Sequence, residues 1–182
     1  MTKQTLAALA ATTLLAACGN LPFQIPFGTA PGGEQTQIGP DGQPIPVAYH
    51  ISAAEQAQIP TRVLGQINLL RANSGLTPLA LSPQLAAAAM AHSRDMSAQN
   101  RAWHFGSDGS SPLDRVKRQG YAGRLLGEDI SETYENDIAT LGAWMQNRDT
   151  RDIIMDPSAR ELGIGWFQEQ SNKIWWTVLI GG

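Results

Sequence analysis

The sequence contains one cysteine, Cys18, among its 182 residues. A disulfide within the chain is therefore excluded, and so is a zinc site with two cysteine ligands. A metal site would have to use histidine and carboxylate ligands, and the chain has only three histidines. With one cysteine and three histidines, the chain offers few side chains that can bind a transition metal.

The sequence also lacks an excess of positive charge and a long apolar run. It has 13 basic and 16 acidic residues, a net charge of −3, and no basic stripe, so nucleic acid is not an expected partner. The longest uncharged apolar run, Leu6–Ala17, is shorter than the roughly 20 residues that cross a bilayer. The apolar fraction of 42% is that of a globular protein with one core.

The N-terminus has the features of an export signal. Lys3 precedes the Leu- and Ala-rich run, which predicts a signal peptide over residues 1–17. The run ends Leu15-Ala16-Ala17-Cys18, which resembles the lipobox of bacterial lipoproteins. That resemblance implies cleavage before Cys18 and its acylation, palmitate included; the alternative is an ordinary signal peptide with a chance cysteine. Position 19, directly after the cysteine, is Gly rather than Asp, which favours anchoring in the outer membrane of the cell envelope over the inner membrane.

A linker is predicted between the lipid anchor and the folded domain. Residues 18–50 are rich in Pro and Gly and show neither the helical nor the strand period. We therefore expect a signal peptide over 1–17, a lipidated Cys18 with a flexible linker over 18–50, and one folded domain over 51–182.

The domain begins with helices. Apolar spacing and capping residues predict four of them, with Pro60 interrupting the chain before the first, and one further turn over residues 150–155. The four helices are expected at Thr61–Ala72, Pro83–Gln99, Ser111–Gln119 and Asn136–Gln146. The segment LTPLALSP after the first helix is predicted to be a short extended link.

The domain ends in strands. A short strand is predicted within Tyr121–Ile130, and ELGIGWFQ, a turn at Glu169–Lys173 and IWWTVLIGG predict an antiparallel hairpin. Gly163 and Gly165 leave one face of the first hairpin strand bare, so another element can approach it closely. Helices first and a hairpin last predict an α+β fold: an α-β-α sandwich with a small antiparallel sheet flanked by about four helices.

The candidate site lies on either side of the third helix. Ser111, Pro112 and Asp114 form a capping-box-like start, and Gly120 ends the helix. His104 precedes it and Glu128 follows it, so a short helix can fold the two into one cleft. His92 lies on the apolar face of the second helix, where a hydrogen-bonded core histidine is more common than a ligand.

Several motifs resemble the bacterial branch of the CAP superfamily, the SCP domain shared by cysteine-rich secretory, antigen 5 and pathogenesis-related proteins. They are LLRANSGLTPLALSPQLAAAAMAHSRDM, HFGSDGSSPLDRVKRQGY, GEDI, WMQNRDTRDIIMDPSARELGIG and WWTVLIGG, from about Val63 to Gly182. The resemblance implies an α-β-α sandwich whose cleft holds two histidines and two acids that bind a divalent metal in some members. His104 matches the first histidine, and Glu128 matches the acid of a Gly-Glu-Asn motif in which Asp129 replaces the Asn.

At other positions of the implied cleft, this chain carries different residue types from the family. Thr150 stands where the family carries its second histidine, and Asn147 stands where some eukaryotic members carry the second acid. Glu161 matches an acid common before the Gly-x-Gly strand of bacterial members. With His104 and Glu128 as the candidate metal ligands, a tight zinc site is not expected unless Glu161, Asp149 or His92 also reaches the cleft. No cofactor is predicted, and a divalent metal such as zinc is the alternative.

Three roles remain open for the pair. His104 and Glu128 can pin a loop to the sheet, can border a binding cleft for a small or apolar ligand or an envelope protein, or can act in a metal-assisted hydrolase on peptides or peptidoglycan. The sequence has no Gly-x-Ser-x-Gly elbow. Trp103, Trp166, Trp175 and Trp176 could line a cleft, although large aromatics in a small sheet are usually core. The sequence favours an envelope-anchored, non-catalytic binding or interaction module.

Overall fold

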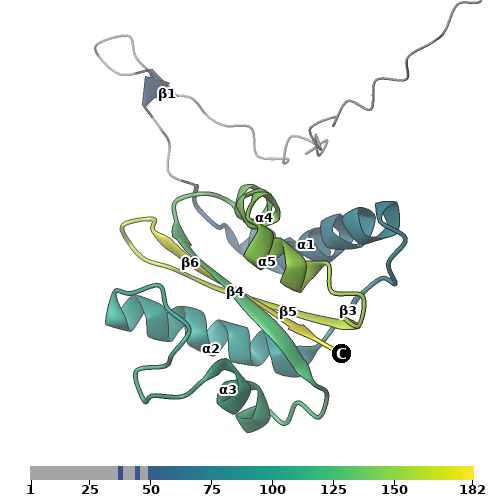
Figure 1. The fold of residues 1–182 in the computed structure, drawn as a ribbon. Helices are drawn as coiled ribbons and strands as arrows, with labels where there is room; N and C mark the ends of the chain where they lie inside the picture. Colours follow the sequence, from purple (N-terminus) through teal and green to yellow (C-terminus); the bar gives the residue numbers. More distant parts are fainter. Residues whose placement is uncertain (1–36, 39–43, 46–48) are drawn as a thin grey trace, which may run out of the picture.

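The computed structural model describes residues 37–38, 44–45 and 49–182 (Figure 1). The predicted signal peptide and Cys18 lie outside these residues. Within the predicted linker, the two-residue strands β1 (Gln37–Ile38) and β2 (Pro44–Ile45) pair antiparallel with each other. Among the helices of the described segments, none combines the length and apolar character needed to cross a membrane.

The domain has five helices and four strands. Their order is α1 (Ala53–Asn73), β3 (Ala80–Leu81), α2 (Pro83–Gln99), α3 (Pro112–Arg118), β4 (Leu125–Thr133), α4 (Asp137–Gln146), α5 (Arg148–Ile154), β5 (Glu161–Gln168) and β6 (Ile174–Gly181). The second helix and the first hairpin strand have their predicted bounds, and the second hairpin strand ends one residue before the predicted Gly182. The fourth helix begins after the predicted cap, Asn136, whose side chain accepts from the amide of Ala139.

The four strands form one sheet in the order β3-β5-β6-β4. The predicted hairpin, β5 with β6, is confirmed, and β4 pairs antiparallel with β6. The sheet is nevertheless mixed, because β3 pairs with β5 in parallel. The predicted extended link joins the sheet through two backbone hydrogen bonds of 2.9 Å. The amide of Ala80 donates to the carbonyl oxygen of Arg160, and the amide of Ser82 donates to that of Leu162.

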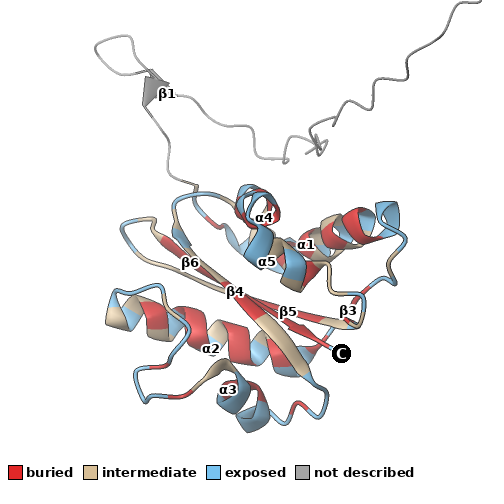
Figure 2. Ribbon diagram, viewed as in Figure 1, coloured by how far each residue is buried: buried red, intermediate tan, exposed pale blue. Residues whose placement is uncertain are grey.

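Helices cover both faces of the sheet, so the predicted α-β-α sandwich is confirmed. Helices α1, α4 and α5 lie on one face and α2 and α3 on the other (Figure 1). Strand β6 is buried along its whole length (Figure 2). Its alternate residues belong to two cores: Val178 packs with residues of α1 and α4, and Leu179 packs with residues of α2. A hydrogen bond of 2.9 Å from α2 to β6, between Ser93 and Thr177, crosses the second interface.

Helix α2 packs against the face of β5 that Gly163 and Gly165 leave without side chains, so the predicted close approach of another element is confirmed. A Cβ atom added at Gly163 would lie 2.2 Å from the backbone carbon of Leu85, and one at Gly165 would lie 2.1 Å from the backbone nitrogen of Met90. Ala88 and Ala89 are fully buried at the same interface. Small residues on both elements therefore allow the helix backbone to approach the sheet closely.

The prediction that Pro60 interrupts the chain is wrong, because α1 runs through it. Ser52 and Glu55 form a capping box that starts the helix at Ala53, well before Pro60. The proline removes one backbone donor, while fully buried Ile59 and Val63 keep the turns on either side against the core. Tertiary packing thus overrides a local helix-breaking signal.

Two other elements differ in extent from their predicted ranges. Strand β4 begins later than Tyr121 and continues past Ile130, because its pairing with β6 extends to Thr133 opposite Ile174. The turn predicted at residues 150–155 is a full helix, α5, which begins earlier because Asn147 caps it. The capping box of α3, from Ser111 to Asp114, is confirmed.

Candidate functional site

Glu128 on β4 is the centre of a buried polar cluster beneath the loop over residues 100–111. Its side chain is 2% exposed, and its Oε1 lies 2.9 Å from Nδ1 of His104. The imidazole of His104 is 52% exposed. The structure therefore brings together the two residues that the sequence placed on either side of α3, with Glu128 inside and His104 at the surface.

Arg115 on α3 holds the other side of the same carboxylate. Its Nη2 lies 2.6 Å from Oε2 of Glu128, and its Nη1 donates to the carbonyl oxygens of His104 and Ser110 at 2.9 and 3.0 Å. One buried guanidinium thus joins the loop, the helix and the edge strand. Sequence reasoning missed this residue, because in PLDRVKR it is one of three basic residues and only the inward turn of the helix distinguishes it.

His92 on α2 completes the cluster from below. The side chain is fully buried, and Nε2 lies 3.0 Å from the carbonyl oxygen of Trp103 and 3.7 Å from Oε1 of Glu128. Since a carbonyl only accepts, Nε2 is the donor in that bond. Burial lowers the pKa of His92, which keeps the ring neutral. His92 is thus a hydrogen-bonded core histidine, the more common of the two roles considered for it.

Asp129 is the next residue of β4 and points to the opposite face of the sheet. It is 1% exposed, and neither carboxyl oxygen has a hydrogen-bond partner among the described residues. Burial, with a smaller contribution from the charge of Glu128, raises its pKa from 3.8 to about 8. Asp129 therefore carries a proton at neutral pH for the most part, in contrast to its neighbour.

The three other residues of the predicted cleft make contacts elsewhere. The hydroxyl of Thr150 donates to the carbonyl oxygen of Trp144 at 2.6 Å, and Asn147 caps α5 by accepting from the amide of Asp149 at 3.0 Å. Glu161 accepts a 2.7 Å bond from the hydroxyl of Tyr121. Within the described part of the chain, no hydrogen bond or ion pair joins any of them to His104 or Glu128.

The donor set does not fit a metal ion. Residues 49–182 contain no group of three His, Cys, Asp or Glu side chains placed to hold one. Zinc takes three or four protein ligands. Helix α5, which carries Thr150, lies on the opposite face of the sheet from α3, whose Arg115 contacts Glu128 (Figure 1). The oxygens of Glu128 are already bonded to His104 and Arg115, so this carboxylate is poorly placed to serve as a ligand.

A nucleophile is also missing from the cluster. Among the described residues, no serine hydroxyl is hydrogen-bonded to His104. Ser107 donates its hydroxyl to Asp95 at 2.6 Å, and Ser111 donates its own to Asp114 at 2.6 Å while capping α3. What the geometry does provide is an imidazole whose Nδ1 is held by a buried carboxylate.

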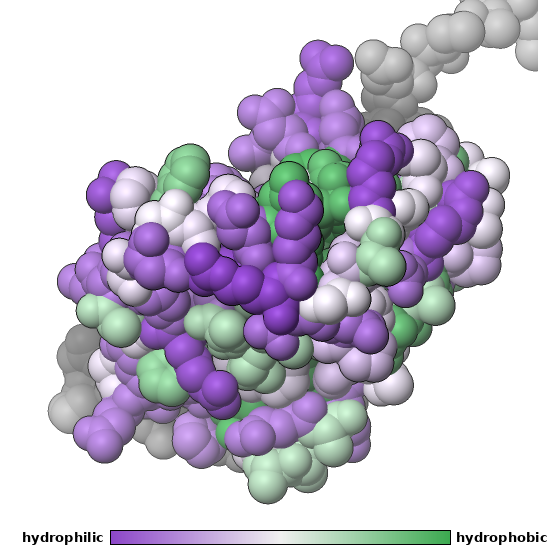
Figure 3. Space-filling model, turned by 90° about the horizontal axis from the view of Figure 1, so that it is seen from below, coloured by the Kyte–Doolittle hydropathy of each residue, from purple (hydrophilic) through white to green (hydrophobic). Residues whose placement is uncertain are grey.

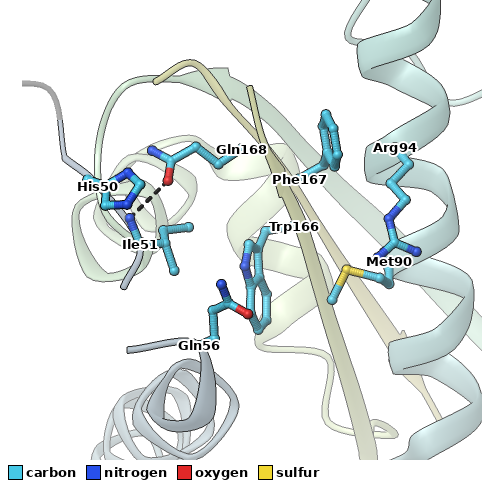
Figure 4. A pocket seen from close by; sticks show the side chains of 8 residues that line it. All are labelled: His50, Ile51, Gln56, Met90, Arg94, Trp166, Phe167 and Gln168. Carbon is cyan, nitrogen blue, oxygen red and sulfur yellow. Dashed lines mark hydrogen bonds between the residues drawn. The ribbon is translucent and has the colours of Figure 1, made fainter. Parts of the chain in front are cut away.

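A separate cavity of about 320 Å³ lies between the start of the domain, α2 and the end of β5. Trp166, Met90 and Ile51 line its apolar part, and Arg94 stands at its edge (Figure 4). Gln168 fixes the chain entering the domain by accepting from the amide of Ile51 at 2.9 Å and donating to the carbonyl oxygen of Tyr49 at 2.6 Å. The remaining lining residues are His50, Gln56 and Phe167.

The four tryptophans proposed for a cleft thus have different roles. Trp175 and Trp176 are fully buried in the core. Trp103 lies under the guanidinium of Arg101, whose Cζ is 3.8 Å from the ring centroid. Trp166 is the member of this group that lines the cavity described above.

Known proteins share this fold. The uncharacterised Bacillus subtilis protein YkwD is 30% identical over 120 residues, which is 66% of this chain but 46% of YkwD. An extracellular SCP-domain protein of Bacillus anthracis is 22% identical with a TM-score of 0.64, over 73% of this chain and 44% of that one. An outer surface protein of Borrelia burgdorferi is 16% identical with a TM-score of 0.65, over 74% of this chain and 98% of that one.

The match to YkwD spans less than half of that protein's length, so its whole activity does not transfer to this chain. The two solved structures share the fold, and one of those proteins is extracellular while the other lies on the outer surface of the cell. Residues 64–180, well over half of the chain, match the cysteine-rich secretory protein family (CAP). Together with the sandwich fold, this match confirms the resemblance seen in the motifs: the chain belongs to the CAP family of cysteine-rich secretory proteins.

Proposed function

We propose that this protein is an exported lipoprotein that presents a non-catalytic CAP domain at the cell envelope, where the domain binds a small, largely apolar ligand. The leader, the lipobox-like Leu15-Ala16-Ala17-Cys18 and the linker support the anchoring. The extracellular and surface placement stated for two proteins of the same fold agrees with export. Several acyl chains on Cys18 would hold the protein on a bilayer far more firmly than a single chain.

The contacts of Glu128 carry the non-catalytic part of the proposal. A general base or a metal ligand must be reachable and must gain from a proton or a cation, but this carboxylate is buried, its charge is paired with the guanidinium of Arg115 at 2.6 Å, and it is bonded to His104 at 2.9 Å. The same guanidinium binds two loop carbonyls. The cluster therefore stabilises the loop over residues 100–111 against β4, and it acts without a metal.

The cavity at Trp166 is the proposed binding site. An indole, a thioether and an isoleucine side chain offer apolar contact, and Arg94 offers one positive charge beside them. This combination suits a ligand with an aromatic or aliphatic body and one anionic group. The cavity lies where the chain enters the domain, since His50 and Ile51 are among its lining residues.

Binding of 1-anilinonaphthalene-8-sulfonate, which has an aromatic body and one sulfonate, tests this site on the full chain in detergent. We expect Arg94→Gln to weaken binding about tenfold, as for the loss of one charged contact of about 1.4 kcal/mol. Arg101→Gln, which removes an exposed guanidinium outside the cavity, is the matched control and should leave the affinity unchanged. Equal affinity of both variants and the native protein would refute this location.

The anchor is tested separately by Cys18→Ser. We expect the native protein in the membrane fraction and the variant in the soluble fraction, with acyl groups detected by mass spectrometry only on the native protein. An unacylated native protein, or a variant that stays in membranes after a high-salt wash, would contradict lipid anchoring. This outcome does not depend on the ligand experiment.

One observation favours a second candidate function, a hydrolase of peptides or peptidoglycan. A half-exposed imidazole held at Nδ1 by a buried carboxylate has the arrangement of a general base with its orienting partner. Peptidoglycan turnover by the full chain that disappears in His104→Ala, without a fall in melting temperature, would establish this function and reject the non-catalytic one.

A further inference from the structure

The edge of β5 that faces away from β6 is paired over part of its length. Strand β3 pairs with it at Glu161 and Leu162 and ends there, whereas β5 continues to Gln168. The amide of Ser82, directly after β3, donates to the carbonyl oxygen of Leu162 at 2.9 Å. Beyond Leu162, no described strand lies beside this edge. The second half of β5 therefore has a free edge.

Two hydrogen bonds show which backbone groups face the free edge. Along a strand, the N–H and C=O groups of successive residues point alternately to one neighbour and to the other. The carbonyl oxygen of Leu162 accepts from the β3 side, whereas the amide of Glu169 donates to Lys173 across the hairpin turn at 2.8 Å. The N–H and C=O groups of Trp166 and Gln168 therefore point to the free edge. Among the described residues, no helix, loop or side-chain atom bonds to them.

The cavity at Trp166 borders this free edge. Three successive residues of β5, Trp166 to Gln168, line the cavity, and all three are partly buried. Met90 and Arg94 of α2 lie on one side of the strand, and Ile51 lies on the other (Figure 4). The cavity therefore combines apolar side chains with the unpaired backbone donors and acceptors of a strand.

Arg94 gives this cavity a positive charge at a defined end. It has no ion-pair partner among the described residues, and none of the described lining residues is acidic. Helix α2 runs in the same direction as β5, because Leu85 lies against Gly163 and Met90 lies against Gly165. Arg94 is one helical turn beyond Met90 and is therefore closer to the C-terminal end of β5.

We propose that the ligand of the Trp166 cavity is an extended apolar peptide that adds a strand to the free edge of β5 and ends in a free carboxylate. This inference rests on the proposed function, since it names the ligand class of the same site. The peptide donates N–H groups to the carbonyl oxygens of Trp166 and Gln168 and accepts from the N–H of Gln168. With its carboxylate at Arg94, the peptide runs parallel to β5, as β3 does.

Two other surfaces of the domain lack this combination. On β4, the opposite edge of the sheet, the carbonyl oxygen of Ile130 already accepts from the indole of Trp144 at 3.2 Å. A cavity of about 240 Å³ lies between α2, the loop over residues 106–110 and α3, and none of its described lining residues belongs to a strand. Hydrophilic residues cover most of the molecular face on the side of α3 (Figure 3). An apolar peptide strand therefore fits the edge of β5 better than either of these surfaces.

Isothermal titration of the full chain in detergent with the peptide N-acetyl-Ala-Val-Ala-Leu tests the charge at the end of the cavity. The free acid should bind about tenfold more tightly than the C-terminal amide, because the acid alone offers an anion to Arg94. Arg94→Gln should remove this difference, whereas Arg101→Gln, outside the cavity, should retain it. Equal affinity of acid and amide for the native protein would overturn the assignment of the carboxylate to Arg94.

N-methylation of single amides tests the pairing with the strand. Successive N–H groups of an extended peptide point to opposite sides, so one of the two central amides, of Val and of the second Ala, faces β5. N-methylation of that amide should weaken binding about tenfold, because it removes a hydrogen bond and places a methyl group against the edge. N-methylation of the other central amide should leave the affinity unchanged.

Three results would overturn the proposal. If the two N-methylated peptides bind with equal affinity, the peptide is not paired with β5. If no peptide binds while 1-anilinonaphthalene-8-sulfonate binds in a way that depends on Arg94, the cavity takes an apolar anion but no strand, and the proposed function stands without this inference. If neither probe binds, the inference and the proposed binding site fail together.

Discussion

At the scale of single residues, the buried ion pair of Arg115 and Glu128 holds the polar cluster together. Arg115→Met should lower the free energy of unfolding by about 3–5 kcal/mol, because it leaves the carboxylate of Glu128 buried without its charge partner. Urea denaturation of the full chain measures this loss.

The matched control is Arg118→Met, in the same helix. Arg118 is 57% exposed, and its partner Asp108 is 52% exposed, so this substitution should change the free energy of unfolding by no more than about 0.5 kcal/mol. Similar losses for the two variants would show that the pair with Glu128 has no special role.

Asp129 gives the second prediction at this scale. Its pKa is raised from 3.8 to about 8 in the folded protein, so between these values the folded state holds a proton that the unfolded state releases. Stability from this group is therefore present at low pH and is lost as the pH rises toward 8, by up to about 1.4 kcal/mol per pH unit.

Asp129→Asn, which mimics the neutral form, should remove that loss. The variant should gain stability relative to the native protein between about pH 5 and about pH 8 in chemical denaturation. His92 titrates in both proteins, so its contribution cancels when the free energy of unfolding of one protein is subtracted from that of the other. A constant difference across this range would contradict the raised pKa of Asp129.

At the scale of elements, the packing of α2 against β5 depends on glycine. Gly165→Ala should destabilise the protein by about 1–3 kcal/mol or more, because the new methyl group would meet the backbone of Met90. Gly65→Ala is the control: Gly65 lies in α1 with nothing within 4 Å of its Cβ position, so alanine should stabilise the protein by about 0.5–1 kcal/mol. Thermal unfolding of both variants measures these shifts, and a stable Gly165→Ala protein would refute the close approach.

The elements that the sequence predicted are those with local signals. The caps Ser82, Ser111 and Asn136 fix the starts of three helices, and the apolar hairpin around Glu169–Lys173 fixes two strands. The elements that it missed depend on distant partners: β3 exists only through its pairing with β5, and α1 passes Pro60 because of core packing.

The candidate site was predictable to a similar degree. The proximity of His104 and Glu128 followed from a short capped helix between them. Arg115 could not be singled out, because its role comes from the orientation of α3 against β4. Nδ1 of His92 and Nε of Arg115 are buried without a hydrogen-bond partner among the described residues, a property of three-dimensional packing for which the sequence carries no signal.

At the scale of the whole molecule, the domain is a sandwich whose polar cluster at the edge strand holds a long loop in place. One cavity borders this cluster, and the cavity at Trp166 lies apart from it. The linker and the lipobox-like segment join this domain to a proposed membrane anchor. Binding, rather than turnover, is the role that we propose for this domain.

Isothermal titration of the full chain with zinc tests most directly whether Glu128 is committed to Arg115 and His104. We expect zinc to bind weakly, if at all, and His104→Ala to leave the titration unchanged, because the described residues hold no group of three ligands and the guanidinium of Arg115 neutralises the carboxylate. Sub-micromolar zinc binding that His104→Ala abolishes would contradict this commitment and, with it, the non-catalytic role of the cluster.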